Sequence, residues 1–598
     1  MMSSQAWLAT AILLAALVAF TWSRVRPDVI AMAVVVGLSL TGVVTAAGAL
    51  AGFSDPTVVT IAALYVVSAG LERTGIAVLA ADWLVRAAGP SERTLIVILM
   101  ALAGIFSAFM NIIGAMAMLL PVTLAVCRRA SIRPSRLLLP LAIGARLGGA
   151  LTLIGKPSNL IVSSLLVQAG QAPLSFFAFF PVGASLLAIG IVFMVLIGHR
   201  LLPARPLAAI TPTGAPRLTL RETYRLPERM FRLHVAAGSP LAGRSLAETS
   251  LGTAFGITIL AIDRGRHRVH GPSPAERLRP GDRMMVEARP EDVARLRDTT
   301  AVEVESYGGA ESDLLEAEEV GLVEVVIAPR SDLAGSSPRQ LEFRQRYGLT
   351  VVAIWRQGQP RRTWLADLPL QYGDALLLQG PRDRIHALRQ DPNFISLDEP
   401  PTPRRSRMAP AVLAVVTLTV LPTTQITAVS VAALLAAGIV VLGGCVRAEE
   451  VFQAIDWRTV VVTGGLMPLG IALYQTGAAA TLAGRLVPPG SLPVIALGAV
   501  LLVAFVIGHF IPSVPATIVV APIALSAATA LGVPPGPFLI TVASATSVTL
   551  LTPISHPVSL MVMGPGGYRP GDYARLGAPL AVLLGATLLA VVSLVWRV

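Results

Sequence analysis

The sequence contains few charged residues and few cysteines. Only 14% of its 598 residues are charged, 54% are hydrophobic, and the mean hydropathy is +0.70. About a quarter of the residues of a soluble globular domain are charged, so this composition excludes an ordinary soluble protein and predicts a polytopic α-helical membrane protein. The two cysteines, Cys127 and Cys445, lie far apart at the ends of apolar runs. Neither a disulfide framework nor a cysteine metal site is indicated.

Lysine is almost absent. Lys156 is the only lysine among 47 basic residues, and it lies in an apolar segment, 146–160, that also contains helix-breaking glycine and proline. An ionisable side chain inside a membrane segment costs roughly 2.5 to 3.5 kcal/mol and usually marks a functional site. The alternative is that Lys156 extends from a helix end to the lipid headgroups.

The excess of basic residues gives a net charge of +12, but no basic stripe alternates with aromatic residues. We therefore attribute the charge to membrane topology and to contact with lipid headgroups, and we expect no nucleic-acid partner. The first apolar run has no basic residues before it and is followed by Arg24 and Arg26. We interpret it as a transmembrane helix and not as a signal peptide.

Long apolar runs form two blocks, each run able to contribute to a span of roughly 20 residues. The first block has runs at 6–23, 28–50, 56–72, 93–127, 135–168 and 176–198, and the second has runs at 408–423, 426–445, 458–474, 490–529, 536–564 and 576–595. Between them, 204–404 is polar and alternates as short strands do, which predicts a soluble insert. The predicted organisation is a first transmembrane repeat at 1–203, a linker at 204–229, a small domain at 230–302, an acidic linker at 303–319, a second small domain at 320–397, a linker at 398–407 and a second transmembrane repeat at 408–598. We interpret the acidic run as a solvated linker and not as a metal site.

The two membrane blocks repeat each other. Residues 151–160 align with 551–560 at an offset of 400, which places His556 opposite Lys156 and Ser559 opposite Asn159. The loop 128–136 carries four arginines, whereas its counterpart 524–538 carries no charge. The positive-inside rule therefore predicts opposite orientations for the two blocks, that is, an inverted repeat.

Helix-breaking residues interrupt both blocks at 111–114, 155–159, 508–515 and 552–559. Inverted repeats with broken helices are typical of secondary transporters, which bind substrate where the breaks meet. The alternative is that proline and glycine merely kink packed helices. No Asp or Glu lies in the breaks, and helix N-termini favour anions, so the pattern predicts an anionic substrate. The candidate substrate-binding residues are Asn111, Thr152, Lys156, Ser158, Asn159, Ser513, Thr517, His556 and Ser559. For His556, a structural hydrogen bond at a helix end remains an alternative.

The motifs at 107–111, 155–160 and 555–568 resemble those of the divalent anion:sodium symporters. The resemblance covers both membrane blocks and implies an elevator-type fold with re-entrant hairpins, carrying a dicarboxylate, citrate or sulfate. It also implies a homodimer in the lipid bilayer of the cell inner membrane, with sodium as a coupling ion. By position, the sodium ligands implied by the resemblance are Asn111, Ser158 and Asn159.

The chain departs from that family at two polar tips. Where the family commonly has Asn-Asn-Thr, this chain has Asn111 followed by two isoleucines, and Ser513 follows a proline where the family commonly has Ser-Asn. Sodium requires several oxygen ligands. We therefore hypothesise that the Lys156 ammonium replaces one bound cation.

The insert contains its own duplication. Segments 255–262 and 347–354, and the Gly-Asp pairs at 281–282 and 373–374, recur at an offset of 92. Each unit is expected to form a strand, a short helix, a β-hairpin and a last apolar strand, at 284–286 or 375–378. The two units resemble the C-terminal domains of potassium-conductance regulators (TrkA-C type). That resemblance implies small paired α+β modules that can bind a small effector. The arginines at 200–232 place the insert in the cytoplasm.

Together these patterns predict a secondary active transporter of a small anion, whose cytoplasmic insert either regulates transport or serves only in dimerisation. The alternative is a ligand-gated channel or membrane receptor controlled by that insert. An enzyme is disfavoured because the breaks contain no paired carboxylates, no metal-ligand cluster and no Ser-His-Asp set. No cofactor is expected beyond the coupling ion.

Overall fold

The computed structural model describes residues 3–597, except 22–24, 77–78, 80–88, 90, 204–229, 256, 266, 271, 274, 289, 301, 307–319, 329–330, 357–358, 362–364, 389–390, 392, 398–406 and 489. The predicted linkers at 204–229 and 398–407, except for Arg407, lie outside the described residues, as does most of the predicted acidic linker.

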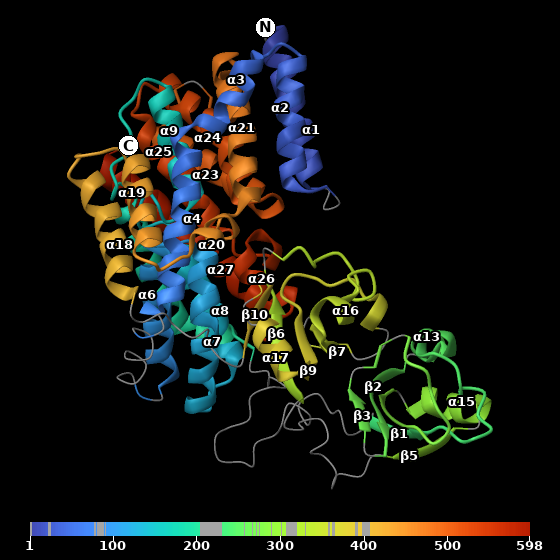
Figure 1. The fold of residues 1–598 in the computed structure, drawn as a ribbon. Helices are drawn as coiled ribbons and strands as arrows, with labels where there is room; N and C mark the ends of the chain where they lie inside the picture. The colour runs from blue at the N-terminus through green and yellow to red at the C-terminus, as the bar shows by residue number, and fades with distance from the viewer. Residues whose placement is uncertain are drawn as a thin grey trace.

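The described secondary structure of the first membrane block consists of helices joined by loops and breaks (Figure 1). Its helices are α1 Ser4–Thr21, α2 Pro27–Leu40, α3 Ala46–Ala51, α4 Pro56–Thr74, α6 Glu92–Phe109, α7 Ile112–Ala130, α8 Pro134–Gly148, α9 Pro157–Gln168, α10 Phe180–Phe193 and α11 His199–Leu201. The second block contains α18 Met408–Thr423, α19 Val429–Leu442, α20 Ala448–Ala454, α21 Trp457–Gln475, α22 Ala478–Leu486, α23 Pro493–Phe510, α24 Ser513–Ala530, α25 Pro535–Val548, α26 Pro557–Met563 and α27 Pro570–Trp596.

Eight of the described helices are long and apolar enough to cross a membrane, or nine if α21 and α22, which bend by 73°, count as one span. A polytopic helical membrane protein is thus confirmed. The apolar run 93–127 is not one helix. It forms the hairpin of α6 and α7, because the chain turns at Met110 and Asn111.

Helix boundaries recur between the two blocks. The helices α23 and α24 form a second hairpin, the counterpart of α6 and α7. The second helices of the two hairpins begin at Ile112 and Ser513, 401 positions apart, and the helices after the two later breaks begin at Pro157 and Pro557, 400 positions apart. Proline suits the first helical position because its missing N–H would have no partner there. The four interruptions, at 110–111, 149–156, 511–512 and 549–556, overlap the predicted breaks, but three of them begin earlier and part of each predicted break is helical.

Glycines bring α6 and α8 into close contact. A Cβ atom built on Gly148 would lie 2.2 Å from the Cα and carbonyl oxygen of Gly104, and one on Gly144 would lie 2.6 Å from backbone atoms of Met100. Small residues allow such backbone approach between membrane helices. This contact fixes α8, whose C-terminal end leads into the break before α9. We call this break, residues 149–156, the first break, and its counterpart before α26, residues 549–556, the second break.

The insert forms two antiparallel five-stranded sheets. The first has the order β3-β2-β4-β1-β5 and the second β10-β6-β9-β7-β8. Their strands are β1 Met230–His234, β2 Thr258–Arg264, β3 His267–His270, β4 Arg283–Glu287, β5 Glu303–Ser306, β6 Val320–Ile327, β7 Thr350–Arg356, β8 Gln359–Arg361, β9 Ala375–Pro381 and β10 Phe394–Ser396. The helices of eleven and seven residues that follow β4 and β9 are α15 Pro290–Thr300 and α17 Arg382–Leu388.

Two expectations about the insert are corrected. The strands β4 and β9 are not the last strands of their units, because a helix and a further strand follow each of them. Residues 303–306 do not belong to a linker. They form β5, which pairs with β1, so the backbone groups of this acidic segment bond within the sheet.

The two sheet units share a set of polar contacts. In the first unit, the Arg264 guanidinium donates from Nε and Nη2 to Asp282, at 3.0 and 3.1 Å. In the second, Arg356 donates to Asp374 at 2.8 and 2.6 Å, again 92 positions on. Burial raises the pKa of the Asp374 carboxyl even beside this arginine. Each aspartate thereby holds the turn that precedes the central strand of its sheet.

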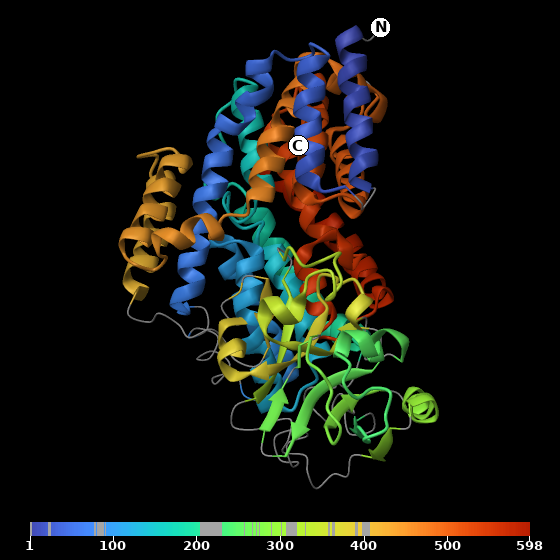
Figure 2. The ribbon, with the colours of Figure 1, turned by 45° about the vertical axis from the view of Figure 1, so that its right-hand side comes forward.

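The two units pack face to face. Leu260, Ala261 and Met285 of the first unit lie against Val352, Ala353 and Leu377 of the second. Arg344 of the second unit donates to the carbonyl oxygens of Pro272 and Ile259 of the first, at 2.6 and 3.1 Å. Burial lowers the pKa of Arg344 to about 10. Figures 1 and 2 show the second unit between the first unit and the membrane helices.

Candidate functional site

Lys156 lies at the end of the first break, directly before α9. Its side chain is 6% exposed, and Nζ donates to the Ala543 carbonyl at 2.5 Å, to Ser547 Oγ at 2.6 Å and to Thr546 Oγ1 at 3.1 Å. All three acceptors belong to the last turns of α25. The C-terminal end of a helix carries a partial negative charge that favours a cation. Lys156 therefore does not extend to the lipid headgroups but joins the first break to the second membrane block.

Arg146 is a second buried cation, at the end of α8. Its Nη2 donates to the Thr549 carbonyl at 2.6 Å and to Thr549 Oγ1 at 2.8 Å. Its Nη1 donates to Ser559 Oγ at 3.3 Å and to Ser555 Oγ at 3.4 Å. Arg146 therefore joins the first membrane block to the second break. This arginine was not among the residues predicted for the site, although an arginine inside the apolar run 135–168 was a usable signal.

The two cations make reciprocal contacts. Lys156, in the break of the first block, contacts α25, while Arg146, on α8, contacts the break of the second block, and α8 and α25 begin 401 positions apart. Within the described residues, neither cation forms an ion pair with a carboxylate. Their partners are hydroxyl and carbonyl oxygens only. A membrane interior is a costly place for two charges without a counter-ion.

Asn159 and Thr152 hold the first break in shape. Asn159 Nδ2 donates to the carbonyl oxygens of Thr152 and Gly149, at 2.8 and 3.1 Å, and the Thr152 hydroxyl donates to the Ala108 carbonyl. Both side chains are buried. Asn159 Oδ1 is buried and has no hydrogen-bond partner among the described residues.

Asn111 forms the tip of the first hairpin. Its Oδ1 accepts from the Ile113 N–H at 2.8 Å, which caps α7, and its backbone N–H donates to Ser68 Oγ of α4 at 2.8 Å. An asparagine at this position satisfies a helix N–H that would otherwise have no partner.

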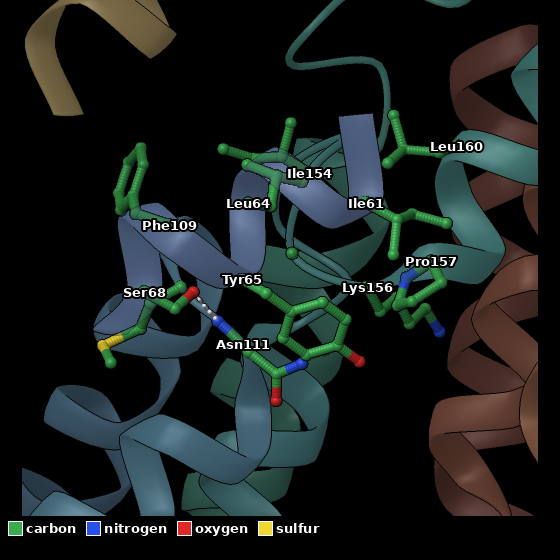
Figure 3. Close-up of a pocket in the computed structure, with 12 residues that line it drawn as sticks. Ile61, Leu64, Tyr65, Ser68, Phe109, Asn111, Ile154, Lys156, Pro157 and Leu160 are labelled. Carbon is green, nitrogen blue, oxygen red and sulfur yellow. Dashed lines mark hydrogen bonds between the residues drawn. The ribbon is translucent and has the colours of Figure 1, made fainter. Parts of the chain in front are cut away.

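A pocket of about 330 Å³ opens between this tip, the first break and α4. Tyr65, Ser68, Asn111 and Lys156 supply its polar side chains, and residues such as Ile61 and Leu160 line the rest. Figure 3 shows the Lys156 side chain pointing away from Tyr65, toward helices of the second block. The pocket thus adjoins the break in which the buried lysine lies.

Ser158 joins the first break to the second hairpin. Its hydroxyl donates to the Ser513 carbonyl at 3.4 Å, the same oxygen that accepts from Thr517 Oγ1 at 2.8 Å. The Thr517 hydroxyl is therefore engaged by its own helix. Of the predicted site residues, the structure brings Ser158 and Ser513 together across the two blocks.

His556 caps the helix after the second break. Its Nδ1 accepts from the Val558 N–H at 3.3 Å, which is the structural bond that the sequence analysis kept as an alternative. Within the described residues, no hydrogen bond joins His556 to Lys156. Ser559 accepts from Arg146, and its carbonyl accepts from the Tyr573 hydroxyl at 2.6 Å.

The site offers little to a metal that prefers charged ligands. Among the residues that the structure describes, no three His, Cys, Asp or Glu side chains form a group that could hold a metal ion. Of the three sodium ligands implied by the resemblance, Asn111 uses its Oδ1 on Ile113, Ser158 donates to Ser513, and Asn159 keeps a free oxygen.

Comparisons with known proteins identify the chain's relatives. A family model described as a citrate transporter, CitMHS, matches residues 17–532. The chain is 34% identical to the uncharacterized transporter YfbS of Escherichia coli over 98% of both chains, and 33% identical to the uncharacterized transporter sll0640 of Synechocystis over 99% of both. It is 28% identical to sodium/sulfate cotransporter 2 of Chlamydomonas reinhardtii over 44% of this chain and 31% of that protein. This family and these relatives are transporters, not enzymes.

Proposed function

Because the chain belongs to the CitMHS citrate transporter family, we propose that it is a secondary active transporter of a small anion, either sulfate-like or a di- or tricarboxylate. The name of one relative, a sodium/sulfate cotransporter, supports a sulfate-like substrate, and the family description supports a carboxylate. Both anions present oxygen atoms to hydroxyls, amides and cationic nitrogens, so the same site chemistry serves either.

The observation that carries the proposal is the pair of buried cations. Lys156 and Arg146 are 6% and 2% exposed, and their partners in the described chain are all uncharged oxygens. Burying an ion without its counter-ion costs several kcal/mol. An anion bound beside the two breaks would neutralise this charge, whereas a cationic substrate would be repelled by it.

The mechanism we propose is an elevator movement of the two broken-helix regions as one unit. Reciprocal bonds support it, because Lys156 attaches the first break to α25 and Arg146 attaches the second break to α8. A site whose two halves are tied together in this way can move without losing its geometry. The recurring helix boundaries support the inverted repeat that such a movement uses.

For the coupling ion, we propose that the Lys156 ammonium replaces one bound cation. Its ligands are one carbonyl and two hydroxyl oxygens at a helix C-terminus, a set that would also suit an alkali cation. Asn159 Oδ1, which has no hydrogen-bond partner among the described residues, is the ligand that we propose for a further ion. The transporter would then use fewer sodium ions than a relative without the lysine, or none.

We further propose an inner-membrane location with the insert in the cytoplasm, and a homodimer. Three arginines at helix ends support one orientation. Arg136 donates to the His199 carbonyl, and Arg458 donates to Tyr372 of the insert. The third, Arg569, follows Tyr568, whose hydroxyl donates to the Ser135 carbonyl beside Arg136. Basic residues are retained on the cytoplasmic side. We also propose that the units of the insert, which resemble TrkA-C domains, bind a small effector.

Uptake into proteoliposomes tests the function. Purified protein should accumulate radiolabelled sulfate or citrate above the level of protein-free liposomes, and the rate should saturate with concentration. Preloading with the same anion should accelerate uptake in a carrier. A flux that neither saturates nor responds to preloading would favour the ligand-gated channel instead, and no flux of any tested anion by folded protein would reject the proposal.

A further inference from the structure

One turn of the insert contacts the site-bearing helix directly through its backbone. A Cβ atom built on Gly373 would lie 2.2 Å from the carbonyl oxygen of Leu560, in α26. A Cβ atom built on Gly564, directly after α26, would lie 2.2 Å from the carbonyl oxygen of Gly373. No side chain can be inserted at either position without displacing the contact. Two glycines thus make a reciprocal close approach between the insert and the second break.

The turn is held rigidly from within the insert. Gly373 has φ of +81°, a conformation that suits glycine, and the neighbouring Asp374 is 2% exposed. Asp374 accepts from Arg356 and from the Gln371 N–H at 2.8 Å. A rigid turn can transmit force, because it cannot absorb a displacement of the helix it touches.

Apolar packing extends this contact. Val326, Ala375 and Leu397 of the second unit are buried in the same hydrophobic cluster as the membrane helices, and Trp355 packs against that cluster. Trp355 also packs against the interface between the two units. The second unit therefore connects the first unit to the membrane part through one continuous apolar layer.

The first unit does not share this contact, although it contains the same turn. Asp282 accepts from Arg264 and from the Arg279 N–H at 2.8 Å, as Asp374 does from its partners. A Cβ atom built on Gly281, however, would meet no atom of the described residues within 4 Å. The docking is thus a property of the second unit and does not follow from the shape of the turn alone.

The turn also contacts a different group of membrane helices. The Tyr372 hydroxyl accepts from Arg458 Nη1, at the start of α21, at 3.5 Å. α21 packs on α2, α4 and α24, whereas α26 packs on α7 and α8. The turn therefore contacts two helices with different main neighbours, and these neighbours meet where α4 packs on α7. A movement of α26 relative to α21 would require it to release one of them.

We propose that the second insert unit is a brake on transport: its turn 372–374 links α26 to α21, and transport accelerates when the turn undocks. This inference rests on the proposed transport function, because it assumes that α26 moves during the cycle. Ser559, the Arg146 partner, precedes Leu560, the docking residue. The brake thus acts one residue away from the candidate site.

Gly564→Ala tests the brake. Gly564 has φ of −64° and ψ of −63°, which alanine adopts, so the substitution adds only the clash with Gly373. Gly571→Ala is the matched control, because a Cβ atom there would meet nothing within 4 Å. We expect the maximal uptake rate to rise roughly threefold or more in Gly564→Ala, since overpacking of this size displaces a contact, and to stay at the wild-type level in Gly571→Ala. Tyr372→Phe, which removes the acceptor of Arg458 with little change in volume, should raise the rate by a smaller factor.

Hydrogen exchange on the full-length protein gives a second readout that does not depend on transport. Peptides covering 371–381 and 557–568 should exchange faster in Gly564→Ala than in wild type or Gly571→Ala. Faster exchange with an unchanged or reduced uptake rate would overturn the brake. Unchanged exchange would overturn the docking. If the wild-type protein transports no tested anion, the proposed function fails, and the exchange experiment still decides whether the turn docks.

Discussion

Replacing Arg146 by methionine tests whether the buried charge serves the anion. Methionine fills much of the volume but removes four hydrogen bonds, of which the two to Thr549 are the shortest, at 2.6 and 2.8 Å. Charged hydrogen bonds contribute roughly 1.5 to 3 kcal/mol each, and the relief of a buried charge offsets several kcal/mol of this loss. We therefore expect the melting temperature of the variant to remain close to that of the wild type.

Anion binding has no such compensation. Removing one partner of a buried charge pair costs about 2 to 5 kcal/mol, and each 1.4 kcal/mol is a factor of ten. Uptake at low anion concentration should therefore fall by at least about 30-fold in Arg146→Met. Initial rates in proteoliposomes measure this, with Arg575→Met, an exposed arginine of α27, as the control. Uptake equal to wild type in both variants would refute the role of the Arg146 charge.

Three further predictions follow from other contacts. Lys156→Ala should make uptake depend on sodium more steeply than in wild type, because an ion must replace the ammonium; full sodium dependence in wild type that is unchanged in the variant would contradict this. Gly148→Ala should lower the free energy of unfolding by about 1 to 3 kcal/mol, since its Cβ atom would meet Gly104 at 2.2 Å, and a lower thermal unfolding midpoint in detergent would show this. Asp374→Ala should release the docked turn and raise the uptake rate, whereas Asp282→Ala, which removes the same bonds in the first unit, should not; equal effects of the two would argue against the brake.

The helices and their interruptions could be predicted from the sequence because they depend on local properties. A membrane-length apolar run and a proline at the first helical position act over a few residues, so the starts of α9 at Pro157 and α26 at Pro557 follow from the pattern. The burial of Lys156 was predictable for a similar reason, because a single lysine in an apolar segment stands out.

The role of Arg146 could not be predicted because arginine is common in this chain. All basic residues except Lys156 are arginine, so its identity carried little information, and its partners Thr549 and Ser559 lie more than 400 positions away. The docked turn was unpredictable for the same physical reason. The Gly373 and Gly564 backbones meet only after two domains have folded and packed.

One strand of the insert could not be predicted from composition. Segment 303–306 is acidic, which suggested a solvated linker, yet Val304 and its neighbours form β5 because β1 offers a free edge. An exposed edge strand can carry charge on its solvent face. Composition alone does not distinguish such a strand from a loop.

The central claim is that this chain carries a small anion between the two breaks held by Lys156 and Arg146. Counterflow is the most direct measurement: proteoliposomes preloaded with unlabelled sulfate or citrate are diluted into a trace of the same labelled anion. We predict a transient accumulation of label by wild-type protein that is at least about 30-fold slower in Arg146→Met. Counterflow that is absent for every tested anion in folded wild-type protein, or equally fast in the variant, would contradict the claim.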